Sequence, residues 1–385
     1  MHLVNVSKDL IRTPLTWLTY AQLSLYGYFV GAFGPAQPLL RSEQHTSYTI
    51  ASLHGTALAL GAALAGVTLT RVVHRIGYTR TLNNALHLLC VGVLICIVAK
   101  PVVFTLPAAF ICGFAGSFTV MVTTSLLRDA HGSAGGEKAL AEANVLASFT
   151  GALGTTLVGV FAATQLGWRT GLLLIIVMTY LLHFFGPKRP ELSHEPHPEG
   201  HQSGNLPIRF WIGLIGVIAA IGSEFATSFW AAALIRENSG TSASLATLTV
   251  MVLLLTMGVG RYIGSIVMHR ISLDLTVLIT LLIALIGFFI FWSGHTTWQN
   301  FIGLGLIGLG LSVQYPLGVA RLFRFIPGLE DHGMGKVSIG AGIAIGGAPL
   351  ILGALGDRYG VSTGYLFLPI LLAIALISLS LSRSR

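Results

Sequence analysis

Long apolar stretches recur along almost the whole of this 385-residue chain. Each is close to the ~20 residues that an α-helix needs to cross ~30 Å of hydrocarbon. Hydrophobic residues make up 54% of the chain and charged residues only 9%, whereas a soluble domain carries about 25% charged residues. The sequence therefore predicts an all-α integral membrane protein with no room for a sizeable soluble domain.

Composition also excludes several other classes of protein. Cys90, Cys96 and Cys112 all lie inside apolar stretches, so we interpret them as small hydrophobic residues and not as metal ligands. The net charge is +8, but the basic residues are scattered at the ends of apolar stretches, where they orient a membrane protein, so no nucleic acid partner is expected. After Arg12 the apolar run continues to about Leu40 without a small-residue cleavage site, which predicts that the first span is retained.

Charges, Gly/Pro clusters and polar runs divide the chain into twelve predicted membrane-spanning helices. These lie near residues 15–38, 48–70, 82–99, 103–127, 141–163, 167–186, 208–234, 244–268, 273–293, 298–322, 336–356 and 361–381. The sixth and seventh helices are separated by the polar, proline-rich segment "PKRPELSHEPHPEGHQSGNLP". This predicts an N-terminal bundle of six helices (residues 1–186), a linker (187–207) and a C-terminal bundle of six helices (208–385).

The linker also contains His194, His197 and His201, which could loosely hold a transition metal. Two prolines between these histidines prevent one helix face from presenting them together. A solvated linker is therefore favoured over a metal site, and neither a metal nor a cofactor is predicted.

The positions of the basic residues predict the orientation of the chain. If the N-terminus is cytoplasmic, 17 of the 22 Lys and Arg residues lie on or near the cytoplasmic side. The other five are Arg41, Lys100, Arg169, Arg236 and Arg358. The positive-inside rule then predicts that both termini are cytoplasmic. We expect a multi-pass protein of the plasma membrane, namely a bacterial inner membrane.

The two halves of the chain share an internal repeat. "VVHRIG" at 72–77 matches "VMHRIS" at 267–272, an offset of 195 residues, and the same offset places Gly113 on Gly308 and Ser117 on Ser312. The matches fall after the second helix and in the fourth helix of each half. They predict a duplicated six-helix unit, which is the architecture of many secondary transporters.

With twelve spans, a polar linker after the sixth and a basic turn between the second and third, the chain resembles the major facilitator superfamily of secondary transporters. In that family the turn usually reads Asp, Arg, any residue, Gly and then basic residues, whereas here His74 stands where the family has Asp. The stretches "GVGRYIGS" (258–265), "GLGLSVQYPLGVARL" (308–322) and "GAGIAIGGAPLILGALGDRYG" (340–360) look like helices eight, ten and eleven of the fucose-permease-like branch. The resemblance implies two pseudo-symmetric bundles around a central cavity.

One acidic residue out of fourteen lies near the middle of a predicted span, namely Glu224. A charge at the centre of a bilayer costs about 2.5–3.5 kcal/mol on insertion scales, so such a residue normally faces a cavity and has a role. Glu224 is therefore predicted to carry a proton or to anchor a substrate. The alternative is a protonated side chain that only hydrogen-bonds a neighbouring helix.

Other candidate cavity residues lie in the same helix as Glu224, or in helices that line the central cavity in the major facilitator superfamily. They are Gln22, Tyr26 and Tyr28 in the first helix, Thr119 in the fourth, Thr227, Ser228 and Trp230 in the seventh, and Gln314 and Tyr315 in the tenth. For the tyrosines a packing role is equally open. Pro316 is the best candidate for a helix kink because proline removes a backbone hydrogen bond.

Three further predictions concern charged and titratable side chains. His54 could relay protons, although a packed, hydrogen-bonded histidine is the commoner case. Arg261 could bind an anionic substrate, snorkel to the surface or pair with a cytoplasmic loop. The resemblance implies a cytoplasmic gate, whose candidate residues are His74, Arg75, Arg80, Arg128, Glu142 and Arg270.

The leading hypothesis is a monomeric, proton-coupled symporter of a small, neutral, polar or amphipathic solute. An exporter or facilitator of hydrophobic or cationic compounds is one alternative. A membrane receptor that binds a solute without moving it is another. An enzyme is not expected, because the polar residues contain no zinc-protease HExxH, Ser-His dyad or phosphate-cradling loop.

Overall fold

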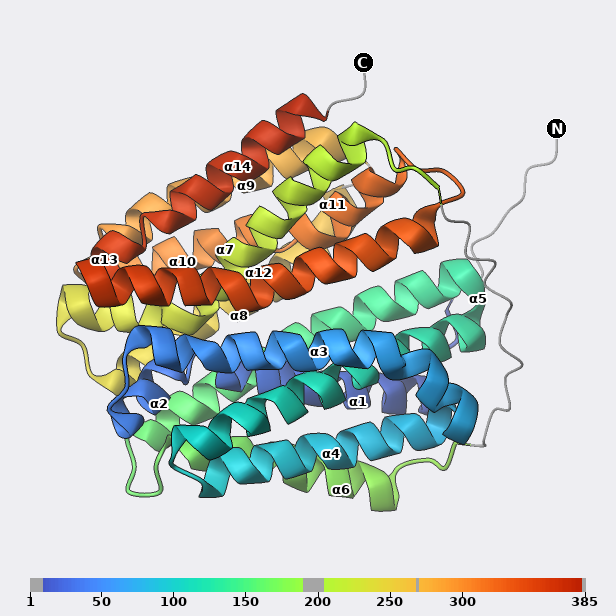
Figure 1. Cartoon of the computed structure of the whole chain (residues 1–385), viewed down its shortest axis with the longest axis horizontal. Helices are drawn as coiled ribbons and strands as arrows, with labels where there is room; N and C mark the ends of the chain where they lie inside the picture. Colours follow the sequence, from blue (N-terminus) through green and yellow to red (C-terminus); the bar gives the residue numbers. More distant parts are fainter. Residues whose placement is uncertain (1–9, 190–203, 268–269, 383–385) are drawn as a thin grey trace.

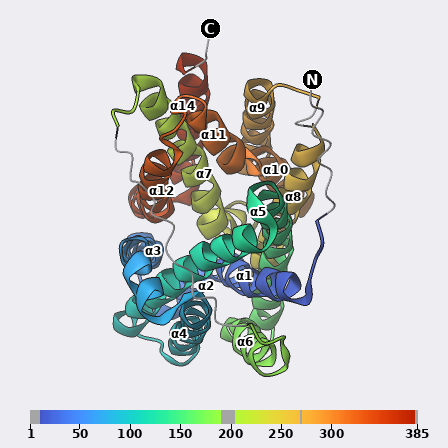
Figure 2. The same ribbon diagram turned by 90° about the vertical axis from the view of Figure 1, so that its right-hand side faces the viewer.

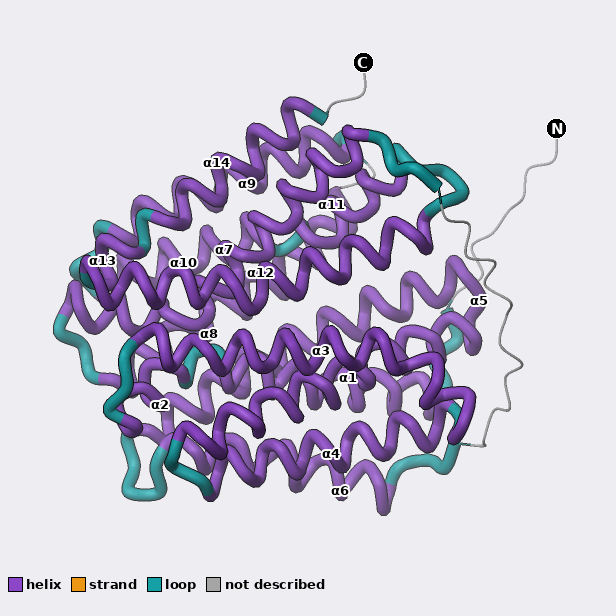
Figure 3. The backbone as a smooth tube through the Cα atoms, in the orientation of Figure 1, coloured by secondary structure: helices purple, strands orange, loops and turns teal. Residues whose placement is uncertain are grey.

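The computed structural model describes residues 10–189, 204–267 and 270–382, and all of its regular elements there are helical (Figure 3). The N-terminal half contains α1 (Pro14–Phe33), α2 (Gln37–Gln44), α3 (Tyr48–Ile76), α4 (Tyr78–Val98), α5 (Val102–Ala162), the 3₁₀ turn η1 (Trp168–Leu172) and α6 (Leu173–Phe185). The C-terminal half contains α7 (Ile208–Ser239), α8 (Ala243–Val267), α9 (Leu273–Trp292), α10 (Thr297–Leu311), α11 (Gln314–Phe323), α12 (Glu330–Tyr359), α13 (Val361–Gly364) and α14 (Phe367–Leu381). His194, His197 and His201 lie outside the described residues.

Local sequence explains where several helices begin. Thr13 caps α1 by accepting a hydrogen bond from the Thr16 backbone N–H, and Pro14 occupies the first turn, where no intrahelical N–H bond is lost. Ser47 and Ser272 cap α3 and α9 in the same way. These side chains satisfy backbone groups that would otherwise be unpaired at the edge of the membrane.

The prediction of an all-helical fold is confirmed for the described residues. Among residues 10–189, 204–267 and 270–382, eleven helical segments are long and apolar enough to cross a membrane. Helix α1 is not among these eleven segments; it has 20 residues and contains threonine, glutamine, serine and tyrosine residues. The predicted helices four and five are confirmed as two spans, Val102–Gly132 and Gly135–Ala162, which α5 joins across a kink at Gly132, where φ is +71°.

Helices α1–α6 lie together on one side of the molecule, and α7–α14 lie together on the other (Figures 1 and 2). We call the membrane face at which α1 and α7 begin and α14 ends the terminal side, which is at the right in Figure 1. The opposite face, where α3 begins and α12 ends, is the distal side. Across the two groups, α3 packs on α12 and α5 packs on α8.

On the distal side the two groups of helices are held together by α3 and α12. The Asp357 carboxylate accepts hydrogen bonds from the backbone N–H groups of Tyr48 and Thr49, at 2.7 and 2.8 Å, and from the Thr49 hydroxyl at 2.6 Å. Deeper in, the Ser52 hydroxyl donates to the Pro349 carbonyl at 2.9 Å. Asp357 thus places a negative charge at the N-terminus of a helix in the other half, where the helix dipole favours it.

The same two helices separate toward the terminal side. In Figure 1, α3 and α12 lie close together at the left and diverge to the right. Val67 of α3 is 83% exposed, and Ile339 and Ile343 of α12 are both 62% exposed. The structure is therefore closed on the distal side, and α3 and α12 are apart on the terminal side.

The tenth membrane-spanning helix is broken between α10 and α11, and the prediction of a kink at Pro316 is confirmed. Proline has no N–H to donate to the carbonyl of Ser312, four residues earlier. The Arg261 Nε of α8 instead lies 3.4 Å from that carbonyl oxygen. A side chain of the neighbouring helix therefore supplies the donor that the proline lacks.

Candidate functional site

Glu224 lies at the middle of α7, and its side chain is partly accessible to solvent. Helix α7 packs against α8, α10, α12 and α14 of its own half and against α2 of the other. The residues on either side of Glu224 and Phe225 are buried within the protein, namely 221–223 and 226–235. Within the described residues, no hydrogen bond or ion pair involves this carboxylate.

The hydroxyl groups beside Glu224 are engaged within α7 itself. Ser223 donates to the Ala219 carbonyl at 3.0 Å, and Thr227 donates to the Ser223 carbonyl at 2.7 Å. Both residues are fully buried. Thr227, a predicted cavity residue, is thus occupied with helix bonding, and the free polar group on this stretch of α7 is the Glu224 carboxyl.

One helical turn distal to Glu224, α7 touches the other half of the molecule. A Cβ added to Gly34 would lie 3.0 Å from the Ser228 Oγ, and one added to Gly55 would lie 2.9 Å from the Phe229 ring. These glycines leave the room that the two side chains occupy. Because a helical turn rises about 5.4 Å, Glu224 lies about that far from this closed contact, toward the terminal side.

Trp230, another predicted cavity residue, is fully buried behind the distal closure. Its Nε1 donates to the Pro349 carbonyl at 3.1 Å, the same oxygen that accepts from Ser52. Its ring also packs edge-to-face on Tyr48, with 5.0 Å between centroids. Trp230 therefore supports the distal contact and does not face the accessible space.

Arg261 is the positive charge whose field reaches Glu224. Its side chain extends from α8 to the other half of the molecule, where NH1 donates to the Ser148 hydroxyl of α5 at 2.5 Å. Together with its bond to Ser312, this contact makes Arg261 a bridge between α5, α8 and the break before α11. Of the roles considered from the sequence, neither snorkelling nor a loop contact describes this arrangement.

Of the predicted aromatic residues, two remain accessible. Tyr315, one residue before Pro316, is 41% exposed. Tyr26 is partly exposed, and its ring packs against Gly116 of α5, where a Cβ would overlap it. Tyr28, by contrast, is buried, and its hydroxyl donates to the Gly171 carbonyl within the N-terminal half at 2.5 Å.

The other predicted polar residues point into the interior of their own halves. The Thr119 hydroxyl donates to the Ala115 carbonyl at 3.0 Å. The Gln314 Nε2 donates to the Thr280 hydroxyl at 2.7 Å, toward α9. Gln22 is only 5% exposed. The structure therefore does not bring Thr119, Gln314, Gln22 or Tyr28 to Glu224.

His54 is fully buried, and both of its ring nitrogens have partners. Nδ1 lies 2.9 Å from the Ala51 carbonyl oxygen and Nε2 lies 2.8 Å from the Thr105 hydroxyl. Because a carbonyl can only accept, Nδ1 carries the proton and Nε2 accepts one from Thr105. This geometry is that of a packed, hydrogen-bonded histidine between α3 and α5.

The acidic residue of the predicted gate, Glu142, bonds within its own half of the molecule. Glu142 bonds Arg12 at 2.7 and 2.9 Å and Tyr20 at 3.1 Å, all within the N-terminal half. The others are exposed on the terminal side, namely His74, Arg75, Arg80, Arg128 and Arg270. A contact between the halves through these side chains would require the terminal side to close.

Comparison with known proteins agrees with this architecture. The model of the Major Facilitator Superfamily matches residues 19–272 and again residues 212–385, so the chain belongs to this family of membrane transporters. No curated protein matches the sequence.

Two solved structures share the fold. One is a bacterial homologue of the human lysosomal transporter Spinster, in an inward-facing and occupied conformation, with TM-score 0.73, 13% identity, and coverage of 96% of this chain and 95% of that one. The other is a point mutant of the nucleoside transporter NupG, with TM-score 0.73, 12% identity, and coverage of 96% and 98%. At these identities the likeness concerns the fold alone.

Proposed function

We propose that this member of the superfamily is a secondary active transporter that moves a small solute by alternating access. The two units that move are the bundles formed by residues 1–186 and 208–385. The observation that carries the proposal is the Glu224 carboxyl, which is partly accessible, has no protein partner among the described residues, and lies next to the closed distal contact. A carboxyl group in this position can exchange a proton or a solute with one side at a time.

Glu224 couples transport to protons through the cost of burying its charge. An ionised carboxylate that loses water without gaining a partner is strongly disfavoured. Closure of the terminal side would remove that water, so it requires Glu224 to be protonated or bound to solute. Protonation from one side and deprotonation toward the other then drives accumulation of the solute.

A neutral solute, polar or amphipathic, fits the groups around Glu224. When Glu224 is ionised, the positive charge of Arg261 offsets part of its negative charge, although the two form no ion pair among the described residues. Tyr315 and Tyr26 offer partly exposed aromatic surface against which the apolar part of a solute can pack. A sugar-like solute or a metabolite with an apolar part would use both features.

The remaining features of the proposal come from the sequence. The terminal side is cytoplasmic by the positive-inside rule, the protein acts as a monomer, and it resides in a bacterial inner membrane. The exposed gate residues would form their contacts when the terminal side closes. We retain the fucose-permease-like branch on the glycine patterns of 258–265, 308–322 and 340–360.

The test begins with a thermal-stability screen of the purified protein against sugars, amino acids, carboxylates and lipophilic cations at acidic and neutral pH. A bound ligand raises the melting temperature by mass action, so a hit does not depend on transport. A preference for lipophilic cations would instead favour an exporter of hydrophobic or cationic compounds. Binding without flux in proteoliposomes would favour a receptor.

With the solute in hand, Glu224→Gln is compared with the wild type in proteoliposomes. The variant should lose proton-driven accumulation and keep exchange of solute across the membrane. The matched control is Glu237→Gln, which removes the other carboxyl of α7 at its distal end and should accumulate solute normally. Undiminished accumulation by Glu224→Gln would refute the coupling role.

A further inference from the structure

A second polar cavity lies inside the N-terminal half, away from Glu224. It has a volume of about 350 Å³ and is formed by α1, α4, α6 and the residues that follow α6. This lies within the ~300–1,000 Å³ range of small-molecule sites. Because α1 and α4 begin here and α6 ends here, the cavity lies at the terminal face of the membrane.

The C-terminal half has a cavity in the corresponding place, but it is nearly filled. With the repeat offset of 195 residues, three residues that line it, Gly213, Val217 and Leu281, correspond to Leu18, Gln22 and Leu86 of the N-terminal cavity. Only about 30 Å³ remains open, about the room of a single water molecule.

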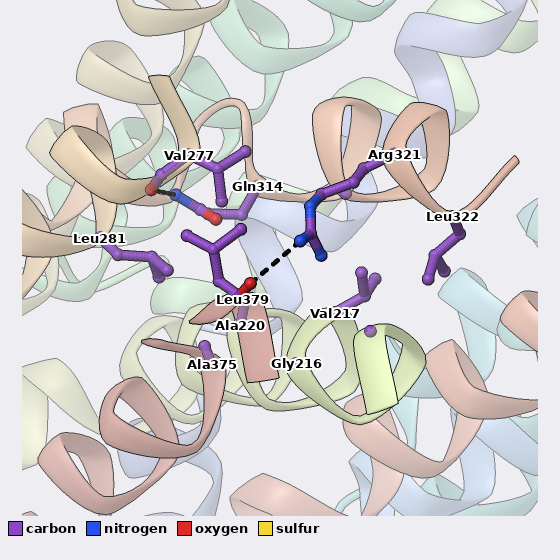
Figure 4. Close-up of a pocket in the computed structure, with 12 residues that line it drawn as sticks. Gly216, Val217, Ala220, Val277, Leu281, Gln314, Arg321, Leu322, Ala375 and Leu379 are labelled. Atoms are coloured by element: carbon purple, nitrogen blue, oxygen red, sulfur yellow. Dashed lines mark hydrogen bonds between the residues drawn. The ribbon is translucent and has the colours of Figure 1, made fainter. Parts of the chain in front are cut away.

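The side chain of Arg321 accounts for the filling (Figure 4). Its guanidinium donates to the Asp274 carboxylate at 2.7 Å, the Ser382 hydroxyl at 2.6 Å and the Leu379 carbonyl at 2.9 Å. In the C-terminal half, an internal ion pair therefore occupies this position between the helices.

The N-terminal half lacks both members of this ion pair. The offset of 195 places Thr79 at the position of Asp274 and Leu126 at the position of Arg321. Three cations line the cavity, Arg80, Lys188 and Arg189, and no carboxylate is among the described residues that line it. One of them, Arg189, also donates to the Thr19 hydroxyl. The cavity is thus both open and positively charged.

Two further groups favour a ligand in this cavity. Gln22 is only 5% exposed and lines the cavity, and its Oε1 has no hydrogen-bond partner in the described part of the chain. Helix α4 begins beside it at Gly77 with no side-chain cap and no acidic residue in its first turn. A helix N-terminus of this kind favours an anion, and a buried amide oxygen requires a donor.

From these observations we propose that the N-terminal cavity binds a phosphate-bearing anion that also carries a hydroxyl group. The phosphate takes the place that the Asp274 carboxylate has in the other half, near the helix N-terminus and the three cations. The hydroxyl donates to the Gln22 Oε1. A glycerol phosphate group has this chemistry, whether it is the headgroup of phosphatidylglycerol or a free molecule, and the membrane-face position of the cavity favours the lipid.

The test is native mass spectrometry of the purified full-length protein, with binding constants for phosphatidylglycerol, phosphatidylcholine and free glycerol phosphate. The wild type should bind phosphatidylglycerol at least fivefold more tightly than phosphatidylcholine. Binding of free glycerol phosphate with equal affinity would identify the soluble molecule as the ligand. Equal binding of the two lipids, without binding of glycerol phosphate, would overturn the proposal.

Two variants connect the binding to this cavity. Thr79→Asp introduces a carboxylate at the position that corresponds to Asp274 in the C-terminal half. The double variant Lys188→Gln/Arg189→Gln removes two of the three cations that line the cavity. Each should lower the affinity at least fivefold. Thr79→Asp removes no native charge and places an acid in the first turn of α4, where acids stabilise helices, so it also serves if the double variant folds poorly.

The matched control is Arg324→Gln, which removes one exposed positive charge from the C-terminal half just after α11. It should bind phosphatidylglycerol as the wild type does. An equal loss in Arg324→Gln would show that general surface charge attracts the lipid, and unchanged binding in Thr79→Asp would also refute the site.

Discussion

Asp357 provides the sharpest test of the distal closure, because one carboxylate joins the two halves through three hydrogen bonds. Its acceptors face Tyr48 and Thr49 at the start of α3, at distances of 2.6–2.8 Å. A hydrogen bond to a charged group contributes about 1.5–3 kcal/mol, but Asp357 is exposed and water competes for all three bonds. We therefore take the whole set to stabilise the distal-closed state by about 1.4 kcal/mol, which is tenfold in an equilibrium constant.

Replacement of Asp357 by Ala should shift the balance between distal-closed and distal-open states about tenfold toward the open state. The assay is electron–electron resonance between spin labels at the distal ends of α3 and α12, which reports the fraction of each state. The matched control is Glu237→Ala. Glu237 also places a carboxylate at a helix N-terminus, accepting from Val361 and Ser362 at 3.1 Å each, but entirely within the C-terminal half.

Glu237→Ala should lower thermal stability without changing the fraction of distal-open protein. If both variants shift the distance distribution equally, the Asp357 contact does not act as a latch between the halves. If neither variant shifts it, the closure depends on packing and not on these hydrogen bonds.

Two other predictions concern packing and an internal ion pair. A Cβ at Gly353 would lie 2.3 Å from the Ser52 Oγ. Gly353→Val should therefore overpack the distal contact by about 1–3 kcal/mol and raise the distal-open fraction in the same resonance assay. Gly347→Val, whose Cβ meets nothing within 4 Å, should leave the distal-open fraction unchanged. Equal distance distributions for the two variants would contradict the close approach of α3 and α12. Arg321→Met leaves Asp274 without its partner and should lower stability by about 3 kcal/mol, measured as a fall in melting temperature, and adding Asp274→Asn should recover part of the loss. Additive losses in the double variant would show that the two residues do not act as a pair.

The sequence predicts the helices well because their signals are local. Apolar length, capping residues and prolines determine where each span begins and ends, and Pro316 correctly indicated the break before α11. Helices four and five were predicted as separate spans, and the structure has two spans there; each extends further into the connection than predicted, because a single glycine at 132 is enough to turn the chain.

The face that each residue presents was harder to predict, because it depends on which helix lies beside it. Tyr28 and Gln314 are deep and polar, as a cavity residue would be, yet each bonds inside its own half. Arg261 was considered mainly as a surface residue, since nothing in the sequence indicates that Ser148 of α5 lies within reach. The contact of Asp357 with α3 joins residues more than 300 positions apart, and a single sequence carries no signal for such a contact.

Glu224 was identified by depth alone, as the acid near mid-membrane. Its side chain is partly accessible and has no partner among the residues that the structure describes, and this is the basis of the proposed coupling. The most direct test of that claim is proton flux in proteoliposomes that contain a pH-sensitive dye, measured when the solute is added without a pH gradient. The account predicts that solute uptake by the wild type is accompanied by acidification of the lumen, and that Glu224→Gln exchanges solute with no proton movement. Proton movement at the wild-type rate in Glu224→Gln would contradict it.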